Sequence, residues 1–173
     1  MNDRIPPAPN PEDPVLNLIN LDLAALTALN NKHARETSLL SEEQFAGMLQ
    51  MAFYARGFGP AFTPAALLIA FNQQALYENP NFRFFRDRHQ RFIYIDRLIT
   101  ASHARRRGLA RMLYDDLFLR TVEAGHCVVG CEVNLDPPNP ASDAFHASMG
   151  FAEVGRALLE NGKTVRYLER SIT

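Results

Sequence analysis

The sequence has almost no net charge. Its 18 Lys and Arg residues nearly balance its 19 Asp and Glu residues. The chain therefore has no overall field of the kind that draws a protein onto nucleic acid or an anionic membrane. We expect neither partner, and any anion that the protein binds must be held locally.

Long apolar runs and targeting signals are also missing. No apolar run reaches the ~18 residues that a membrane span needs, and the N-terminus has no basic-then-apolar signal segment. The two cysteines, Cys127 and Cys131, lie four residues apart, which places them on one face of a strand and matches no zinc-ligand pattern. We expect two buried, reduced thiols, no metal site and a cytoplasmic location.

Proline is concentrated at the N-terminus, where five of the eleven prolines fall within the first 14 residues. Such a stretch cannot supply ladder hydrogen bonds or helical turns, so residues 1–14 are predicted to be a mobile lead-in. With 173 residues in all and 47% apolar residues, the chain can bury a core without disulfides. We expect a single domain over residues 15–173.

The hydrophobic pattern indicates a mixture of strands and helices. Strands are expected at 15–19, 65–71, 91–100, 127–133, 151–153 and 164–169, and helices at 21–29, 41–53, 108–125 and 143–149. Asp22 is the expected cap of the first helix, Ser41 and Gln44 form a capping box, and Gly57 and Gly59 are expected to end the second helix. Residues 72–89 form an unusually long polar and aromatic connection. The strand, helix and strand over 91–134 predict a βαβ unit with two parallel strands.

The clearest motif is Arg105-Arg106-Arg107-Gly108-Leu109-Ala110, where a strand ends and a helix begins. The first turn of a helix leaves backbone N–H groups without partners, and a glycine lets phosphate oxygens approach them. The alternative is a solvated basic turn that enters an amphipathic helix. Phosphate-binding runs typical of ATP and NAD sites are missing, which disfavours both nucleotides.

A second block follows the next expected strand, from Asn139 through Ser142, Phe145 and His146 to Gly150-Phe151. Together the two blocks resemble a bacterial-type branch of the GCN5-related N-acetyltransferase (GNAT) superfamily. Its first motif, Arg/Gln-x-x-Gly-x-Gly/Ala after the fourth strand, is filled by Arg105, Gly108 and Ala110. The resemblance implies an α/β (α+β) fold with helices on both faces of a mostly antiparallel sheet that has a splayed parallel pair at its centre.

The resemblance also implies acetyl-CoA as the cofactor. Its pyrophosphate would lie on the backbone of the 105–110 turn, its pantetheine arm would pair along 98–100 like an added strand, and Asn139 would hold its amide or thioester end. For Asn139 the alternative is a loop cap. The implied cofactor residues are Leu98, Ile99, Thr100, Arg105, Arg106, Arg107, Gly108, Leu109, Ala110, Asn139, Ser142 and Phe145.

His146 stands where the family often has a tyrosine that protonates the departing CoA thiolate. An imidazole can take that role, and the alternative is a histidine packed on a helix face without chemistry. Asp96 and Glu132, on the two parallel strands, are candidate bases, because a half-buried carboxyl has its pKa raised toward neutrality. Either could instead pair with Arg97 or Arg105, and water could carry the proton.

Substrate selection is expected in the N-terminal half, in the polar connection that contains Asn30, Asn31, His33 and Glu36. Glu36 could meet a cationic amine, and the alternative is a solvated loop.

The predicted function is acetyl transfer from acetyl-CoA to a primary amine, on a small molecule or a peptide, by direct attack in a ternary complex. The alternatives are a non-catalytic acyl-CoA-binding or sensing domain and, with less support, a nucleic-acid-binding domain. A homodimer could form through the edge of the closing strand.

Overall fold

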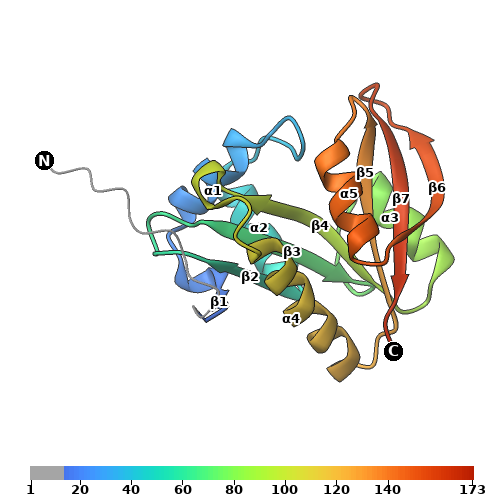
Figure 1. Ribbon diagram of the computed structural model, residues 1–173, viewed down its shortest axis with the longest axis horizontal. Coiled ribbons are helices and arrows are strands. Elements are labelled where there is room, and N and C mark those ends of the chain that lie inside the picture. Colours follow the sequence, from blue (N-terminus) through green and yellow to red (C-terminus); the bar gives the residue numbers. More distant parts are fainter. Residues whose placement is uncertain (1–13) are drawn as a thin grey trace, which may run out of the picture. The chain divides into compact units, whose positions relative to one another are not determined.

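The computed structural model of this protein describes residues 14–173 (Figure 1). The lead-in predicted over residues 1–14 lies outside these residues, apart from Pro14. The helices are α1 (Leu23–Lys32), α2 (Glu42–Met51), α3 (Pro80–Arg88), α4 (Leu109–Glu123) and α5 (Pro140–Ser148), with short 3-10 helices η1 (Leu18–Asn20) and η2 (Ser102–Ala104). The strands are β1 (Leu16–Asn17), β2 (Tyr54–Phe58), β3 (Ala66–Asn72), β4 (Ile93–Thr100), β5 (Val128–Asp136), β6 (Ala152–Leu158) and β7 (Thr164–Ser171).

The strands form one seven-stranded sheet in the order β1-β2-β3-β4-β5-β7-β6. β4 and β5 run parallel, whereas β1 with β2, β5 with β7 and β6 with β7 are antiparallel. The parallel pair arises from the predicted βαβ unit, since two strands that run the same way need a crossover, here α4. The predicted fold class, a mixed sheet that is mostly antiparallel with one parallel pair, is confirmed.

The chain falls into two compact units. Of the described residues, the first unit holds 14–50, 54–69 and 97–115, and the second holds 51–53, 70–96 and 116–173. β3, β4 and α4 each contribute residues to both units. The extent of a single domain over 15–173 stays a prediction.

Both predicted helix caps in the first unit are confirmed. The Asp22 side chain accepts a hydrogen bond from the N–H of Ala25 at 2.8 Å, at the start of α1. The Ser41 hydroxyl accepts from the N–H of Gln44 at 3.1 Å, and the Gln44 side chain accepts from the N–H of Ser41 at 2.9 Å. This reciprocal pair is a capping box, and it fixes where the chain enters α2.

The predicted end of the second helix is wrong. α2 ends at Met51, and Gly57 lies inside β2 instead of terminating a helix. A Cβ atom at Gly57 would overlap the carbonyl oxygen of Ala66 and the side chain of Leu18. The glycine is therefore required for close approach of two strands, a role that periodicity alone does not distinguish from a helix stop.

The long connection predicted over 72–89 contains a helix that the sequence pattern did not predict. The Asn79 side chain caps α3 by accepting from the N–H of Asn81 at 2.8 Å, and Pro80 occupies the first turn. Phe82 and Phe85 are fully buried, while the charged residues of the helix, Arg83, Arg86, Asp87 and Arg88, are exposed. α3 is therefore a short amphipathic helix whose polar residues obscured its apolar stripe.

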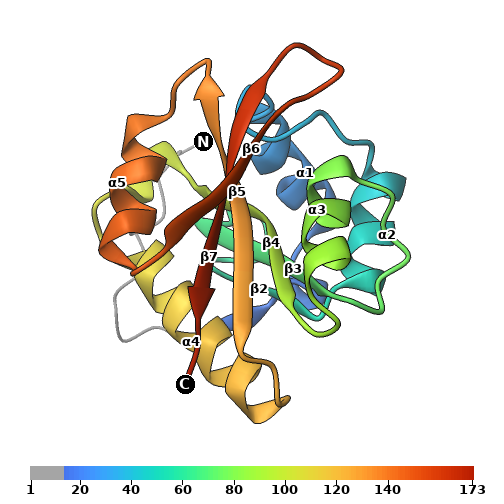
Figure 2. The same ribbon diagram turned by 90° about the vertical axis from the view of Figure 1, so that its right-hand side faces the viewer.

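In the second unit, α3 and α5 lie on opposite sides of the strands β5, β6 and β7 (Figure 2). On the α3 side, Phe84 stacks on Tyr167 with 3.8 Å between ring centroids. A Cβ atom at Gly130 would overlap the ring of Phe85, so this glycine on β5 lets α3 pack closely. One prediction for β5 is wrong: Cys131 is buried, but Cys127 precedes the strand and is exposed.

Candidate active site

The first unit holds the predicted phosphate-binding turn, directly before α4. Arg106 and Gly108 both have positive φ angles, of 61° and 79°. Arg105, Arg106, Arg107 and Gly108 are exposed, and a Cβ atom added at Gly108 would meet nothing within 4 Å. Alternating left-handed residues turn successive N–H groups toward one side, and the first turn of a helix adds donors that lack intrahelical partners. The backbone of this turn is therefore open to a ligand.

The end of β4 leads into this turn. Ile99 is buried, whereas the flanking Leu98 and Thr100 are half-buried, as expected for a strand with one covered face. After the strand, the N–H of Ala101 donates to the carbonyl of Ala65 at 2.8 Å, and η2 follows. The predicted cofactor segment 98–100 is thus the end of a regular strand, which stops five residues before Arg105.

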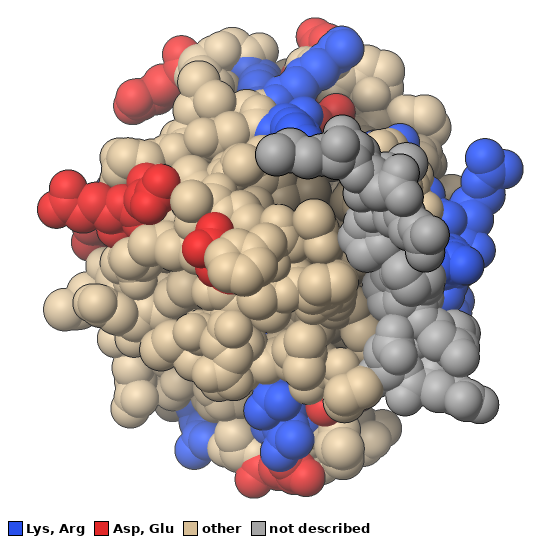
Figure 3. All heavy atoms as spheres, turned by 90° about the vertical axis from the view of Figure 1, so that its left-hand side faces the viewer, with Lys and Arg blue, Asp and Glu red and all other residues tan. Residues whose placement is uncertain are grey.

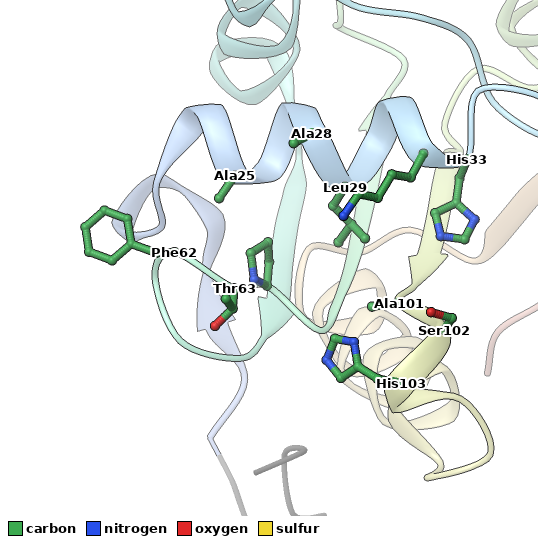
Figure 4. Close-up of a pocket in the computed structure, with 11 residues that line it drawn as sticks. Ala25, Ala28, Leu29, His33, Phe62, Thr63, Ala101, Ser102 and His103 are labelled. Carbon is green, nitrogen blue, oxygen red and sulfur yellow. The ribbon is translucent and has the colours of Figure 1, made fainter. Parts of the chain in front are cut away.

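A cavity of about 390 Å³ lies beneath α1 in the first unit (Figure 4). Ala25, Leu29 and His33 of α1 and its C-cap line one side, and Ser102 and His103 face them from the segment after β4. Of the residues that line this cavity, Lys32, His33 and His103 are basic and none is acidic. The pKa of His33 is lowered, first by burial and then by the positive charge of Arg105. This cavity is suited to an anionic or neutral group better than to a cation.

The connection between α1 and α2 carries the other predicted substrate residues. Asn30 is fully buried, and its side-chain amide donates to the carbonyl of Ser38 at 2.8 Å and to Oδ1 of Asn31 at 2.9 Å. The Asn31 side chain in turn bonds both backbone groups of Leu40. Glu36 is exposed. The two asparagines thus hold the connection in shape, and the substrate roles of all four residues stay predictions.

A buried arginine anchors the same connection. Arg97 on β4 is 5% exposed, and its Nη1 donates to Oδ1 of Asn30 at 2.6 Å. Asp96 accepts a hydrogen bond from the hydroxyl of Tyr77 at 2.6 Å. The alternative pairing of Asp96 or Glu132 with Arg97 or Arg105 stays a prediction.

The second unit brings together the two candidate bases. The ladder between β4 and β5 pairs Ile93 with Val129, Tyr94 with Gly130 and Ile95 with Cys131. Asp96 and Glu132 are the next residue of each strand, so their side chains point to the same face. Both are half-buried. The register therefore places two carboxyl groups side by side at the end of the parallel pairing.

Glu132 accepts two hydrogen bonds. Tyr94 donates its hydroxyl to Oε2 at 2.8 Å, and the Asn81 amide donates to Oε1 at 2.9 Å. Burial and the nearby charge of Asp96 raise the pKa of Glu132 to about 8, against the lowering effect of these two donors. Burial and the charge of Glu132 raise the pKa of Tyr94 well above its ordinary value, so Tyr94 stays a donor. A carboxyl with a pKa near 8 can both take and release a proton close to neutral pH.

The second sequence block forms α5 and its N-cap. The Asn139 side chain accepts from the N–H of Ser142 at 3.2 Å, so it caps α5, as its alternative role predicts. Phe145 and Phe151 both contact the ring of His146 edge-on, at 5.4 and 5.3 Å between centroids. The cofactor roles of Asn139, Ser142 and Phe145 stay predictions.

His146 is 5% exposed. Its Nδ1 lies 2.8 Å from the carbonyl oxygen of Ser142 and 3.2 Å from the Ser142 hydroxyl. Because a carbonyl only accepts, this contact assigns the proton of the neutral ring to Nδ1 and leaves Nε2 as an acceptor. Burial lowers the pKa of His146, which favours the neutral ring. In this state the ring has no proton on Nε2 to give.

Sequence reasoning missed four residues around the carboxyl pair: Tyr77, Asn81, Tyr94 and Tyr167. The Tyr167 hydroxyl donates to Oδ1 of Asn81 at 3.1 Å and so orients the amide that contacts Glu132. A usable signal existed for Tyr94, since strand alternation places it on the same side of β4 as Asp96. No such signal existed for Asn81, which depends on the unpredicted helix α3.

The surface charges, the possible metal ligands and the lengths of the helices bear on whether the protein binds nucleic acid, a metal ion or a membrane. On the face drawn in Figure 3, basic and acidic side chains form separate small groups with uncharged surface between them. Among residues 14–173, no three His, Cys, Asp or Glu side chains gather where they could hold a metal ion. None of the helices in that same range has both the length and the apolar character needed to cross a bilayer. The cytoplasmic location and the homodimer stay predictions.

The model of the Acetyltransferase (GNAT) family matches residues 75–151. This stretch includes both candidate bases, the turn before α4 and the α5 block. The match confirms the resemblance seen in the sequence: over residues 75–151 the chain is similar to the acetyltransferases of the GNAT family. None of the curated proteins matches the chain.

Several solved structures share this fold. The ribosomal-protein-S18-alanine N-acetyltransferase from Escherichia coli has a TM-score of 0.66 at 18% identity, covering 92% of this chain and 94% of that one. The ribosomal-protein-alanine N-acetyltransferase from Brucella melitensis has a TM-score of 0.68 at 19% identity, with 92% and 99% covered. NAA60 from Arabidopsis thaliana, in complex with acetyl-CoA, has a TM-score of 0.68 at 14% identity, with 92% and 97% covered. At these identities the likeness shows the fold alone.

Proposed function

We propose that this chain transfers the acetyl group of acetyl-CoA to a primary amine by direct attack in a ternary complex. The observation that carries the proposal is the turn before α4, where Arg106 and Gly108 have positive φ angles of 61° and 79° and Gly108 has open space beside it. A turn of this shape at a helix N-terminus presents several backbone N–H groups to an anion.

The residues of the turn fit a pyrophosphate. The N–H groups of Gly108, Leu109 and Ala110 would hold its oxygens, and the exposed guanidinium groups of Arg105 to Arg107 would add charge-assisted donors. The strand segment Leu98–Thr100 would offer backbone groups to the pantetheine amides. When bound, acetyl-CoA supplies the activated acetyl thioester.

Glu132 is the base that we assign. A primary amine is mostly protonated near neutral pH, so its nitrogen needs to lose a proton before its lone pair can attack. The Glu132 carboxylate would take that proton on Oε1 or Oε2 and later release it to solvent. The pKa of Glu132, raised to about 8, supports this choice. In balance, the carbon–nitrogen bond forms as the carbon–sulfur bond breaks. One ammonium proton would leave to solvent through Glu132, and a second proton of the attacking nitrogen would go to the departing CoA thiolate to give the free thiol.

The acceptor is a primary amine on a peptide or a small molecule. Two of the solved structures are, by name, ribosomal-protein alanine N-acetyltransferases, which supports a peptide α-amine as the first class to test. The basic cavity beneath α1, with His33 and His103 on its walls, is a candidate site for a carboxylate or another anionic group of the acceptor.

A second candidate function, an acyl-CoA-binding or sensing domain without turnover, is favoured by His146. At the position where the family often has a tyrosine acid, this chain has a buried ring whose proton lies on Nδ1 and bonds the carbonyl of Ser142. Turnover with an amine distinguishes the two functions, because both require acetyl-CoA to bind.

The test is calorimetric titration of the folded protein with acetyl-CoA, beside ATP and NAD. A Gly108→Glu variant should abolish binding, since it adds a carboxylate where the pyrophosphate is expected. Gly162→Glu is the matched control: Gly162 also has a positive φ, of 81°, and open space, but it lies in the turn between β6 and β7. No binding by the wild-type protein, or equal loss in both variants, would contradict the proposed function.

A further inference from the structure

The helix α3 belongs to a segment that connects β3 to β4, two strands that are neighbours in the sheet. Such neighbours can be joined by a short turn, so a connection of this length needs another reason. Two of its side chains reach the carboxyl pair: Tyr77 donates to Asp96 and Asn81 donates to Glu132. Each candidate base is therefore held by a donor from this one segment.

Asn81 is itself held in place. Its N–H donates to the Asn79 side chain at 2.8 Å in the first turn of α3, and its Oδ1 accepts from the Tyr167 hydroxyl at 3.1 Å. With Oδ1 engaged as an acceptor, the NH₂ group is directed to Oε1 of Glu132 at 2.9 Å. Asn81 is 7% exposed, so water competes little for this bond.

The chemistry of the contact decides what it does. An amide NH₂ group can only donate, and it therefore favours the ionised form of the carboxyl that it contacts. Tyr94 acts in the same sense from β4, whereas the charge of Asp96 acts against it. The other titratable groups near Glu132 are Tyr167 on β7 and Cys131 on its own strand. Of these donors, Asn81 is the one that cannot itself lose or gain a proton.

We propose that Asn81 is a positioning residue for the base of this enzyme: through its bond to Oε1 it orients the Glu132 carboxyl and stabilises its ionised form. Only the role of Glu132 as the base rests on the proposed function. The effect of Asn81 on the ionisation of Glu132 does not require any substrate. On this proposal, the helix α3 serves to position the base.

The test is a pH titration of Glu132 by carbon NMR on protein labelled at the glutamate carboxyl, with the resonance assigned by its loss in Glu132→Gln. In Asn81→Ala the midpoint should rise by about one pH unit, because a donor to the charged form is lost. The matched control is Asp87→Ala, on the exposed side of the same helix, and its midpoint should equal that of the wild type. A midpoint in Asn81→Ala within ~0.2 units of the control would overturn the proposal.

A second variant keeps the proposal testable if Asn81→Ala does not fold. Tyr167→Phe keeps the ring that stacks on Phe84 and removes only the hydroxyl that orients Asn81. Its midpoint should rise in the same direction by a smaller amount, and an unchanged midpoint in a folded Tyr167→Phe variant would also count against the proposal.

Turnover gives an independent readout once an amine acceptor is in hand. A rise of the midpoint from about 8 to about 9 lowers the ionised fraction of Glu132 at pH 7 about tenfold, and the loss should fade above pH 9. A merely structural loss would not depend on pH in this way. Failure of acetyl-CoA to bind sinks the proposed function, whereas an unmoved NMR midpoint sinks only the role of Asn81.

Discussion

Two ionisable side chains on the central strands, one in each unit, differ in how the protein accommodates their charge. Arg97, in the first unit, is buried and donates to Oδ1 of Asn30 at 2.6 Å. Glu132, in the second unit, is half-buried beside Asp96, and its pKa is raised to about 8. An arginine keeps its charge inside a protein and must be given acceptors, whereas a glutamate can take up a proton instead.

The difference separates a structural charge from a reactive one. The bond from Arg97 organises the connection between α1 and α2 through Asn30, which in turn contacts Ser38 and Asn31. Glu132 has donors but also a like charge close by, so its two protonation states are near in free energy at neutral pH. The first arrangement holds a loop, and the second suits the proton transfer that we propose for Glu132.

The largest expected effect comes from removing the carboxyl group of Glu132. Glu132→Gln keeps the size of the side chain but cannot accept the proton of an ammonium, so turnover should fall by about 10²- to 10⁴-fold while acetyl-CoA binding is kept. Steady-state kinetics with calorimetry would check both values. Glu43→Gln, on the exposed first turn of α2, is the control. A variant with more than half of wild-type turnover would show that Glu132 is not the base.

Removal of the buried charge of Arg97 should lower the free energy of unfolding. Arg97→Met fills similar space but leaves Oδ1 of Asn30 without one of its donors, which should lower the free energy of unfolding by about 2 to 3 kcal/mol. Urea denaturation would measure this, with the exposed Arg83→Met as control. A loss no larger than that of the control would mean that the network around Asn30 contributes nothing to the fold.

The raised pKa of Glu132 should also appear in the pH dependence of stability. The folded state holds this proton between about pH 4.5 and 8, whereas the unfolded chain has released it. Stability from this group is therefore complete below pH 4.5 and falls as pH rises to about 8, by at most about 1.4 kcal/mol per pH unit. The difference between wild type and Glu132→Gln isolates this effect from the histidines, whose lowered pKa values act in the opposite sense at acid pH.

A glutamate with the opposite shift sharpens this comparison. Glu153 is exposed, and its hydrogen bond to Arg156 lowers its pKa. Its contribution should be present at neutral pH and be lost as the pH falls through its folded-state pKa. If Glu153→Gln and Glu132→Gln changed the pH profile in the same direction, the assigned protonation state of Glu132 would be wrong.

How much of the site could be read from the sequence depends on how local its parts are. The turn at Arg105–Ala110 and the caps at Asp22 and Ser41 follow from neighbouring residues, so pattern and chemistry agree there. Asp96 and Glu132 could be placed together because the β4–α4–β5 unit fixes their strands as parallel. The contact from Asn81 to Glu132 joins residues that are 51 positions apart. It starts from α3, a helix that was not predicted because its polar residues obscured its apolar stripe. No local pattern contains that information.

The smallest expected effect concerns His146. In the neutral ring Nδ1 bonds the carbonyl of Ser142 and Nε2 has no proton, so the side chain cannot act as an acid near pH 7. His146→Asn retains a donor near the position of Nδ1 and should lower turnover by less than about threefold, in contrast to Glu132→Gln. Kinetics between pH 6 and 9, normalised to the folded fraction, would decide. A hundredfold loss that grows with pH would instead identify His146 as the acid that protonates the leaving thiolate. The second unit would then contain two proton-carrying groups, Glu132 and His146.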